Sequence, residues 1–269
     1  MGQLLPKESA GMVYTDGGQG LPLLFLHGWL MSRQVWTCQT QLAECFRVIA
    51  PDLRGHGETG GEEFSYASCV ADLVAFIDHL GLGKVVVVGW SMGAQIALQL
   101  TSRLRDRVAG LVLVGGTPLF CKEEGYGHGV PQAEARSMAL RLRRSFNRTA
   151  GEFYQGMFSP DDVMRTDISV MAKTVAGRLP RLPVALAALE ELVRTDLRGL
   201  LADIPVPVLL IHGGADRICL PGASRFMHEV LPDSRLQLFS GTGHAPFLTM
   251  PAEFNSCLSA FAREVYDAD

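Results

Sequence analysis

A run of four valines that leads into a glycine-framed serine constrains this chain more than any other feature. Residues 85–88 are all β-branched and favour a buried strand, and from Ala94 to Leu100 the apolar residues have helical spacing. Between them stands Gly89-Trp90-Ser91-Met92-Gly93. A strand that turns directly into a helix gives the serine an unusual backbone conformation and leaves no room for side chains at 89 and 93. We therefore expect a sharp turn that presents the Ser91 hydroxyl at the positive end of a helix, with an ordinary glycine-rich turn as the alternative.

Two later strand ends carry the groups that a nucleophilic serine needs. A serine hydroxyl is a weak nucleophile near neutral pH and requires a base and an orienting acid. Asp216 follows the apolar run 206–212, and His244 lies on a glycine-flanked loop after a strand predicted at 235–240. The carboxyl ends of parallel strands share one sheet edge, where ligands bind in open α/β sheets. We expect Ser91, Asp216 and His244 to converge there as nucleophile, acid and base.

The loop after the apolar run 22–27 supplies a fourth element. It begins His27-Gly28-Trp29. The backbone N–H groups of Trp29 and Met92 are expected to form an oxyanion hole for a tetrahedral intermediate. We expect His27 to brace this loop rather than to transfer protons.

Strand and helix signals alternate along the chain, which predicts an α/β fold with a mainly parallel twisted sheet and helices on both faces. Strands are expected at 12–15, 22–27, 46–50, 84–89, 110–115, 206–212 and 235–240, and helices at 34–45, 66–81, 92–103, 223–230 and 251–266. Residues 118–201 lack a convincing strand and are helical in pattern, as at 133–146 and 184–192. We interpret them as an insertion into a core made of residues 1–117 and 202–269.

Composition, charge and residue spacing argue against several classes of partner and cofactor. A chain of 269 residues with 48% hydrophobic residues suits one domain with an insertion, and the net charge of −4 gives no reason to propose nucleic acid or an anionic membrane as a partner. No apolar run approaches the ~20 residues of a membrane helix and no secretory signal is visible, so we expect a cytoplasmic protein. A monomer is also expected. The six cysteines are irregularly spaced and are expected to be reduced. No metal-ligand spacing or nucleotide-binding fingerprint is present, so no metal and no cofactor are predicted.

The predicted insertion contains a basic segment. Residues 136–148 hold five arginines and no acid, and Arg141, Arg144 and Arg148 are three and four residues apart, which predicts one helix face. Arginine binds carboxylates and phosphates through paired donors. This face is interpreted either as a docking site for an acidic protein or anionic substrate, or as an ordinary solvated surface.

Together these segments resemble the α/β-hydrolase superfamily from about Leu23 to about Phe261. The resemblance is carried by His27-Gly28-Trp29, by Pro51-Asp52-Leu53-Arg54-Gly55-His56-Gly57, by the pentapeptide at 89–93, by Asp216, and by Gly243-His244-Ala245-Pro246. It implies Ser-His-Asp chemistry and makes the insertion a cap over the active site.

Within the superfamily the chain looks most like the pimeloyl-acyl-carrier-protein methyl ester carboxylesterases of biotin synthesis. The similar segments are Gly-Trp-Ser-x-Gly, His27-Gly28-Trp29, Arg194-Thr195-Asp196-Leu197-Arg198, His244-Ala245-Pro246-Phe247 and Pro251-Ala252-Glu253-Phe254. The resemblance implies an acidic carrier protein docked on the cap. It also implies substrate contacts from Trp29, Met92, Phe153, Tyr154, Gln155, Gly156 and Met157. Residues 52–57 have the generic hydrolase form, and Met92 stands where leucine is common.

Other activities use the same residues. A C–C bond hydrolase of ring-cleavage products, a thioesterase or a general short-chain esterase would have the same triad, and a non-enzymatic ligand receptor can retain it. Epoxide hydrolases and dehalogenases are disfavoured, because they carry a carboxylate nucleophile at the position of Ser91.

Overall fold

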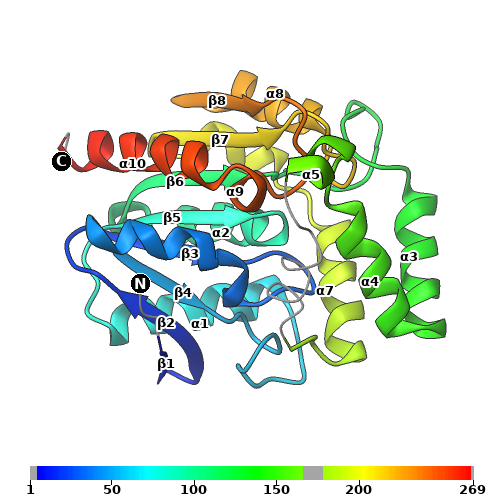
Figure 1. The fold of residues 1–269 in the computed structure, drawn as a ribbon, viewed down its shortest axis with the longest axis horizontal. Coiled ribbons are helices and arrows are strands. Elements are labelled where there is room, and N and C mark those ends of the chain that lie inside the picture. The colour runs from blue at the N-terminus through cyan, green and yellow to red at the C-terminus, as the bar shows by residue number, and fades with distance from the viewer. Residues whose placement is uncertain (1–4, 166–177, 268–269) are drawn as a thin grey trace.

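One eight-stranded sheet organises the chain in the computed structural model, which describes residues 5–165 and 178–267 (Figure 1). The strand order across the described sheet is β1-β2-β4-β3-β5-β6-β7-β8. The strands are β1 (Pro6–Ser9), β2 (Met12–Gly17), β3 (Pro22–Leu26), β4 (Arg47–Pro51), β5 (Val85–Trp90), β6 (Val108–Val114), β7 (Val208–Gly213) and β8 (Ser234–Phe239). β1 and β2 pair antiparallel at one edge, β2 pairs antiparallel with β4, and the remaining pairs are parallel. The predicted fold class is confirmed.

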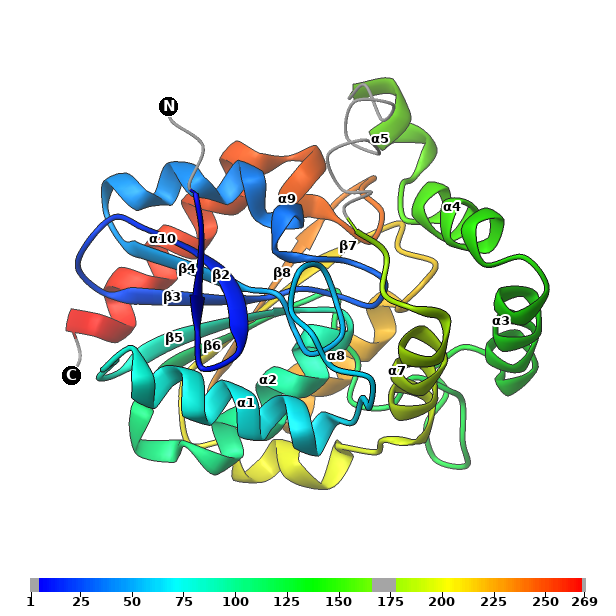
Figure 2. The same ribbon diagram turned by 90° about the horizontal axis from the view of Figure 1, so that it is seen from below.

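Helices cover both faces of the sheet, which is why every residue of β5, β6 and β7 is buried. One face carries α1 (Tyr66–His79), α2 (Met92–Arg103) and α8 (Pro221–Val230), and the other carries η1 (Arg33–Glu44), α9 (Pro246–Thr249) and α10 (Pro251–Asp267) (Figure 2). Within the described ranges, no helix is both long enough and apolar enough to cross a membrane.

The helix predicted after β3 and one edge strand differ from expectation. The helix predicted at 34–45 forms as 3-10 turns with a non-helical backbone at Trp36, because that side chain turns inward onto Phe25 and Phe247, at ring-centroid distances of 5.0 and 4.4 Å. Strand β1 was not predicted, because it is a short edge strand whose residues are mostly exposed and carry no apolar alternation. Pairing with β2 alone makes it a strand.

The segment between β6 and β7 adds a helical layer beyond the carboxyl ends of the strands (Figures 1 and 2). It contains α3 (Gln132–Arg144), α4 (Phe146–Gly156), α5 (Pro160–Arg165) and α7 (Leu182–Arg194), here called the cap helices, followed by η3 (Arg198–Asp203). Whether this layer acts as a lid stays a prediction.

The expectation that three arginines share one helix face is wrong. Arg141 and Arg144 end α3, whereas Arg148 belongs to α4, because the backbone at Ser145 (φ −157°, ψ 78°) leaves the helical region. The chain turns there so that Leu142 and Phe146 both pack against the core.

The turn between β5 and α2 has the strained geometry that the glycines indicated. Ser91 has φ 56° and ψ −117°, a conformation that L-residues rarely adopt. A Cβ atom on Gly93 would collide with the carbonyl oxygens of Leu26 and His27, and one on Gly89 would collide with the Gly93 carbonyl. Glycine is therefore required at both positions by the approach of other backbone atoms.

Replacing Gly93 with alanine tests this packing. Gly93→Ala is expected to lower the free energy of unfolding by about 2 kcal/mol, because backbone atoms of the loop after β3 must move to admit the methyl group. Urea titration measures the change. Gly83→Ala is the control, since a Cβ there meets no atom within 4 Å. Equal stability of the two variants would contradict the argument.

Candidate active site

Ser91 opens into a cavity under the cap helices. The residue is 4% exposed, and its backbone N–H donates to the Val114 carbonyl at 2.9 Å, which fixes the turn against β6. The cavity has a volume of about 370 Å³. Its lining, besides Ser91, is mainly apolar and comes from the core and the cap alike, including Trp29, Phe120, Val130, Met138, Phe153, Leu189, Leu192 and Ile218.

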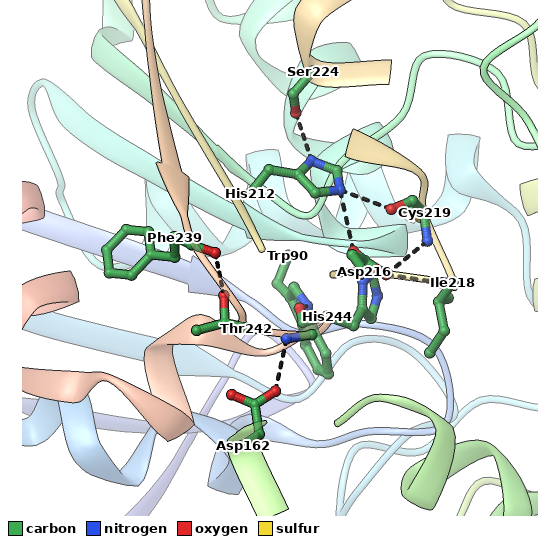
Figure 3. Close-up of polar contacts among 11 residues, drawn as sticks. Trp90, Asp162, His212, Asp216, Ile218, Cys219, Ser224, Phe239, Thr242 and His244 are labelled. Carbon is green, nitrogen blue, oxygen red and sulfur yellow. Dashed lines mark hydrogen bonds and ion pairs between the residues drawn. The ribbon is translucent and has the colours of Figure 1, made fainter. Parts of the chain in front are cut away.

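Asp216 and His244 meet at the same sheet edge (Figure 3). The His244 Nδ1 atom lies 2.6 Å from the Asp216 Oδ2 atom, and Asp216 Oδ1 accepts the N–H groups of Ile218 at 2.8 Å and Cys219 at 3.1 Å. Burial alone raises the pKa of Asp216, but the attraction of His244 and hydrogen bonds from His212 and His244 lower that pKa well below its usual range. Asp216 is therefore ionised, and Nδ1 of His244 carries the proton that it donates.

The other ring nitrogen of His244 is available for chemistry. Nε2 is buried and has no hydrogen-bond partner among the described residues. The Trp90 indole N–H donates to the His244 carbonyl at 2.8 Å, and the two rings pack at 5.3 Å, so His244 lies against the residue that precedes Ser91. Nε2 of His244 therefore makes no hydrogen bond to the Ser91 hydroxyl in this structure.

His212, which sequence reasoning did not select, is a second buried imidazole on Asp216. Its Nε2 atom lies 2.8 Å from the Cys219 carbonyl and 3.1 Å from Asp216 Oδ2, and its Nδ1 atom lies 2.7 Å from the Ser224 hydroxyl. Two oxygens face Nε2, so this nitrogen carries the proton, and the Ser224 hydroxyl donates to Nδ1. His212 thereby holds the carboxylate that orients His244. The available signal was a histidine at the next-to-last position of the buried strand β7, four residues before Asp216.

The loop after β3 approaches the turn at Ser91. Leu30 has φ 61°, and the Trp29 indole N–H donates to the Ala185 carbonyl of α7 at 2.9 Å. Within the described residues, the backbone N–H groups of Trp29 and Met92 donate to no protein acceptor. This is the state an oxyanion hole needs, and that role of the two groups stays a prediction.

His27 has the bracing contacts that the sequence analysis expected. Its Nε2 atom accepts the Leu53 N–H at 3.0 Å, so Nδ1 carries the proton and donates to the Gly28 carbonyl at 2.9 Å. Burial lowers the pKa of His27 to about 4, with a further contribution from nearby Arg33. The ring is neutral near pH 7 and joins the loops after β3 and β4.

Of the seven residues expected to contact substrate, two line the cavity beside Ser91 and five do not. Trp29 and Phe153 line the cavity and stack edge to face at 4.9 Å. Tyr154 is buried and donates its hydroxyl to the Leu30 carbonyl at 2.8 Å, and the Met157 carbonyl accepts the His244 N–H at 2.7 Å. Met92 is buried, whereas Gln155 and Gly156 are exposed. None of these five residues lines the cavity, so their contact with substrate stays a prediction.

Comparison with known proteins identifies the family. A family profile described as alpha/beta hydrolase fold matches residues 22–251. The chain belongs to the α/β-hydrolase fold family. Two pimeloyl-[acyl-carrier protein] methyl ester esterases are similar to this hydrolase. The one from Nitrosomonas europaea is 35% identical, covering 90% of this chain and 96% of its own, and the one from Nitrosospira multiformis is 32% identical, covering 91% and 96%. Among solved structures, an esterase from Exiguobacterium antarcticum superposes with a TM-score of 0.86 at 26% identity, covering 98% of this chain and all of its own.

In residues 5–165 and 178–267, no three His, Cys, Asp or Glu side chains form a group that could hold a metal ion.

The buried histidines His27 and His56 are expected to make the folded protein less stable at acidic pH. Burial lowers the pKa of His56 to about 3, with His27 adding to the effect. A histidine in the unfolded chain has a pKa near 6.5. As the pH falls below that value, His27 and His56 bind protons in the unfolded chain but stay neutral in the folded protein, so the free energy of unfolding decreases. We expect about 2 kcal/mol of stability per histidine to be lost between pH 7 and pH 5. Urea titrations at the two pH values measure it. His56→Asn should remove about half of the loss, and an unchanged pH dependence would contradict the assignment.

Proposed function

We propose that this hydrolase is a serine carboxylesterase with Ser91 as nucleophile, His244 as general base and Asp216 as the group that orients it. The observation that carries the proposal is the buried His244–Asp216 hydrogen bond of 2.6 Å, which leaves Nε2 unpartnered on a ring that packs against Trp90, the residue before the strained turn at Ser91. The order Ser, Asp, His along the chain and the esterase relatives support the same assignment.

The mechanism is a two-step acyl transfer. His244 Nε2 takes the Ser91 proton as the hydroxyl oxygen attacks the ester carbonyl, and Asp216 stabilises the resulting imidazolium. The N–H groups of Trp29 and Met92 stabilise the oxyanion, each contributing roughly 3 kcal/mol when well aimed. The imidazolium then protonates the departing alkoxide. His244 then takes a proton from a water molecule as the water oxygen attacks the acyl-enzyme carbonyl, and the imidazolium gives that proton to the Ser91 oxygen as the acid is released.

The proposed substrate is the methyl ester of pimeloyl-acyl-carrier protein, on the strength of the relatives' names and the cavity. The lining beside Ser91 is apolar, with Trp29, Phe153 and Leu189 offering surface to an acyl chain. Arg141 and Arg217 are the cationic side chains of this lining, and Glu134 is the acidic one.

An acidic carrier protein would dock across the junction of α3 and α4. Arg144 is exposed and makes no ion pair with any described residue. Arg141 and Arg148 share Glu152, at 3.6 and 2.9 Å, so this one carboxylate offsets part of their charge. The surface stays basic across the break at Ser145, although its arginines come from two helices.

Removing the Ser91 hydroxyl tests the nucleophile. Ser91→Ala is expected to lower kcat for p-nitrophenyl butyrate by a factor on the order of 10⁴ or more, with the thermal unfolding temperature unchanged or raised. Ser102→Ala, near the far end of the same helix, should keep wild-type kcat. Substantial turnover by Ser91→Ala would reject Ser91 as the nucleophile.

Reversing charge on the cap tests carrier docking. The double variant Arg144→Glu, Arg148→Glu is expected to raise KM for carrier-linked methyl pimelate by about tenfold or more at low salt, with the difference shrinking as salt is added. Hydrolysis of p-nitrophenyl butyrate should be unaffected. Arg225→Glu on α8 of the core is the matched control. An equal KM for both charge-reversed proteins would place the docking surface elsewhere.

A further inference from the structure

We propose that Asp162, at the start of cap helix α5, is a positioning residue for His244. Through it, the position of the cap helices affects the rate of catalysis. The proposal rests on the proposed role of His244 as the base. The loop after β8, residues 240–245, carries His244 and is called here the histidine loop. Asp162 Oδ2 accepts the Gly243 N–H at 2.7 Å, one residue before His244 (Figure 3).

Three cap groups hold the histidine loop. Besides the bond to Asp162, the His244 N–H donates to the Met157 carbonyl at 2.7 Å, and the Ser159 hydroxyl donates to the Gly241 carbonyl at 2.6 Å. Core groups hold the loop through other carbonyls. The Ala215 N–H donates to Thr242 at 2.8 Å, and the Trp90 indole donates to His244 at 2.8 Å. The backbone N–H groups of residues 243 and 244 thus depend on the cap.

The sequence Ser159-Pro160-Asp161-Asp162 builds this contact from a helix-capping pattern. The Ser159 hydroxyl accepts the Asp162 N–H at 3.1 Å, and Asp162 Oδ2 accepts the Ser159 N–H at 2.9 Å, as in a capping box with proline at the first helical position. The same carboxylate oxygen therefore fixes the start of α5 and the histidine loop at once.

Burial makes this carboxylate depend on its backbone donors. Asp162 is 1% exposed, no Lys or Arg in the described residues pairs with it, and its Oδ1 atom has no hydrogen-bond partner there. A buried carboxylate is costly unless hydrogen bonds compensate for the lost water. The N–H groups of Ser159 and Gly243 supply that compensation, so the loop and the helix start hold each other in place.

Steric evidence supports the same contact independently. A Cβ atom on Gly243 would collide with the Met157 carbonyl oxygen and come within 2.9 Å of the Ser159 nitrogen. The glycine beside the candidate base is thus required because the cap backbone lies against it.

Loss of this contact should reduce turnover more than binding. A displacement of about 1 Å in a catalytic group costs on the order of 10²-fold in rate. Asp162 lies outside the lining of the Ser91 cavity, so substrate affinity has no direct dependence on it. The expected signature is a fall in kcat with little change in KM.

Matched variants of neighbouring acids test the proposal with p-nitrophenyl acetate. Asp162→Ala is expected to lower kcat by about 10- to 100-fold, with KM within about twofold of wild type. Asp162→Asn keeps a side-chain oxygen for the Gly243 N–H and should recover kcat to within about threefold. Asp161→Ala, at an exposed acid whose Oδ2 lies 3.9 Å from an Arg165 nitrogen, is the control and should match wild type.

A second readout does not need hydrolysis. The proton between His244 Nδ1 and Asp216 should give a far-downfield NMR resonance, lost or broadened in Asp162→Ala and retained in Asp162→Asn and Asp161→Ala. A wild-type protein with this resonance and no ester turnover would contradict the proposed function and leave the positioning role testable by NMR.

The proposal is overturned if Asp162→Ala matches Asp161→Ala in both kcat and resonance. It is also overturned if kcat falls in Asp162→Ala and Asp162→Asn does not relieve the fall. Should Asp162→Ala fail to fold, Ser159→Ala replaces it, since that variant removes the bond to Gly241. It is then expected to lower kcat by about threefold to tenfold with unchanged KM, and an unchanged kcat would count against the cap as a support of the loop.

Discussion

The close approach of helix α2 to the end of strand β3 is the constraint on which the rest of the site depends. Gly93 lies against the carbonyl oxygens of Leu26 and His27, and this contact holds Ser91 in its left-handed backbone conformation. It also brings the first N–H of α2 beside the loop that carries Trp29. The unfavourable conformation of Ser91 is tolerated because the turn follows the fully buried parallel strands β5 and β6 and is tied to β6 by the hydrogen bond from the Ser91 N–H to Val114.

The groups opposite Ser91 are held from two layers. Asp216 is fixed by two backbone N–H groups and by His212, all within the core. His244 is fixed partly by the core and partly by the cap, through Met157 and Asp162. Part of the support for the candidate base therefore comes from the cap helices and the residues that join them.

Local pattern predicted much of the fold, and its failures have physical causes. The valines of β5 and the apolar runs of β6 and β7 are read correctly, because a strand buried on both faces excludes polar residues. β1 was missed because an exposed edge strand requires no particular residues. The break at Ser145 was missed because helix-forming residues continue on both sides of it. His212 was not selected because its contact with Asp216 depends on how the turn after β7 folds back, and Asp162 was not selected because Gly243 lies 81 residues away along the chain.

The sequence by itself determined the family, the turn at Ser91 and the three strand ends that bring Ser91, Asp216 and His244 to one sheet edge, because these features follow from short-range periodicity and glycine sterics. The tertiary structure alone decided which side chains line the cavity and which nitrogen of His244 is free. It alone also placed a cap carboxylate against the histidine loop, 81 residues away along the chain. Such contacts depend on how two layers pack, and the free energy of that packing is not encoded in any local pattern of residues.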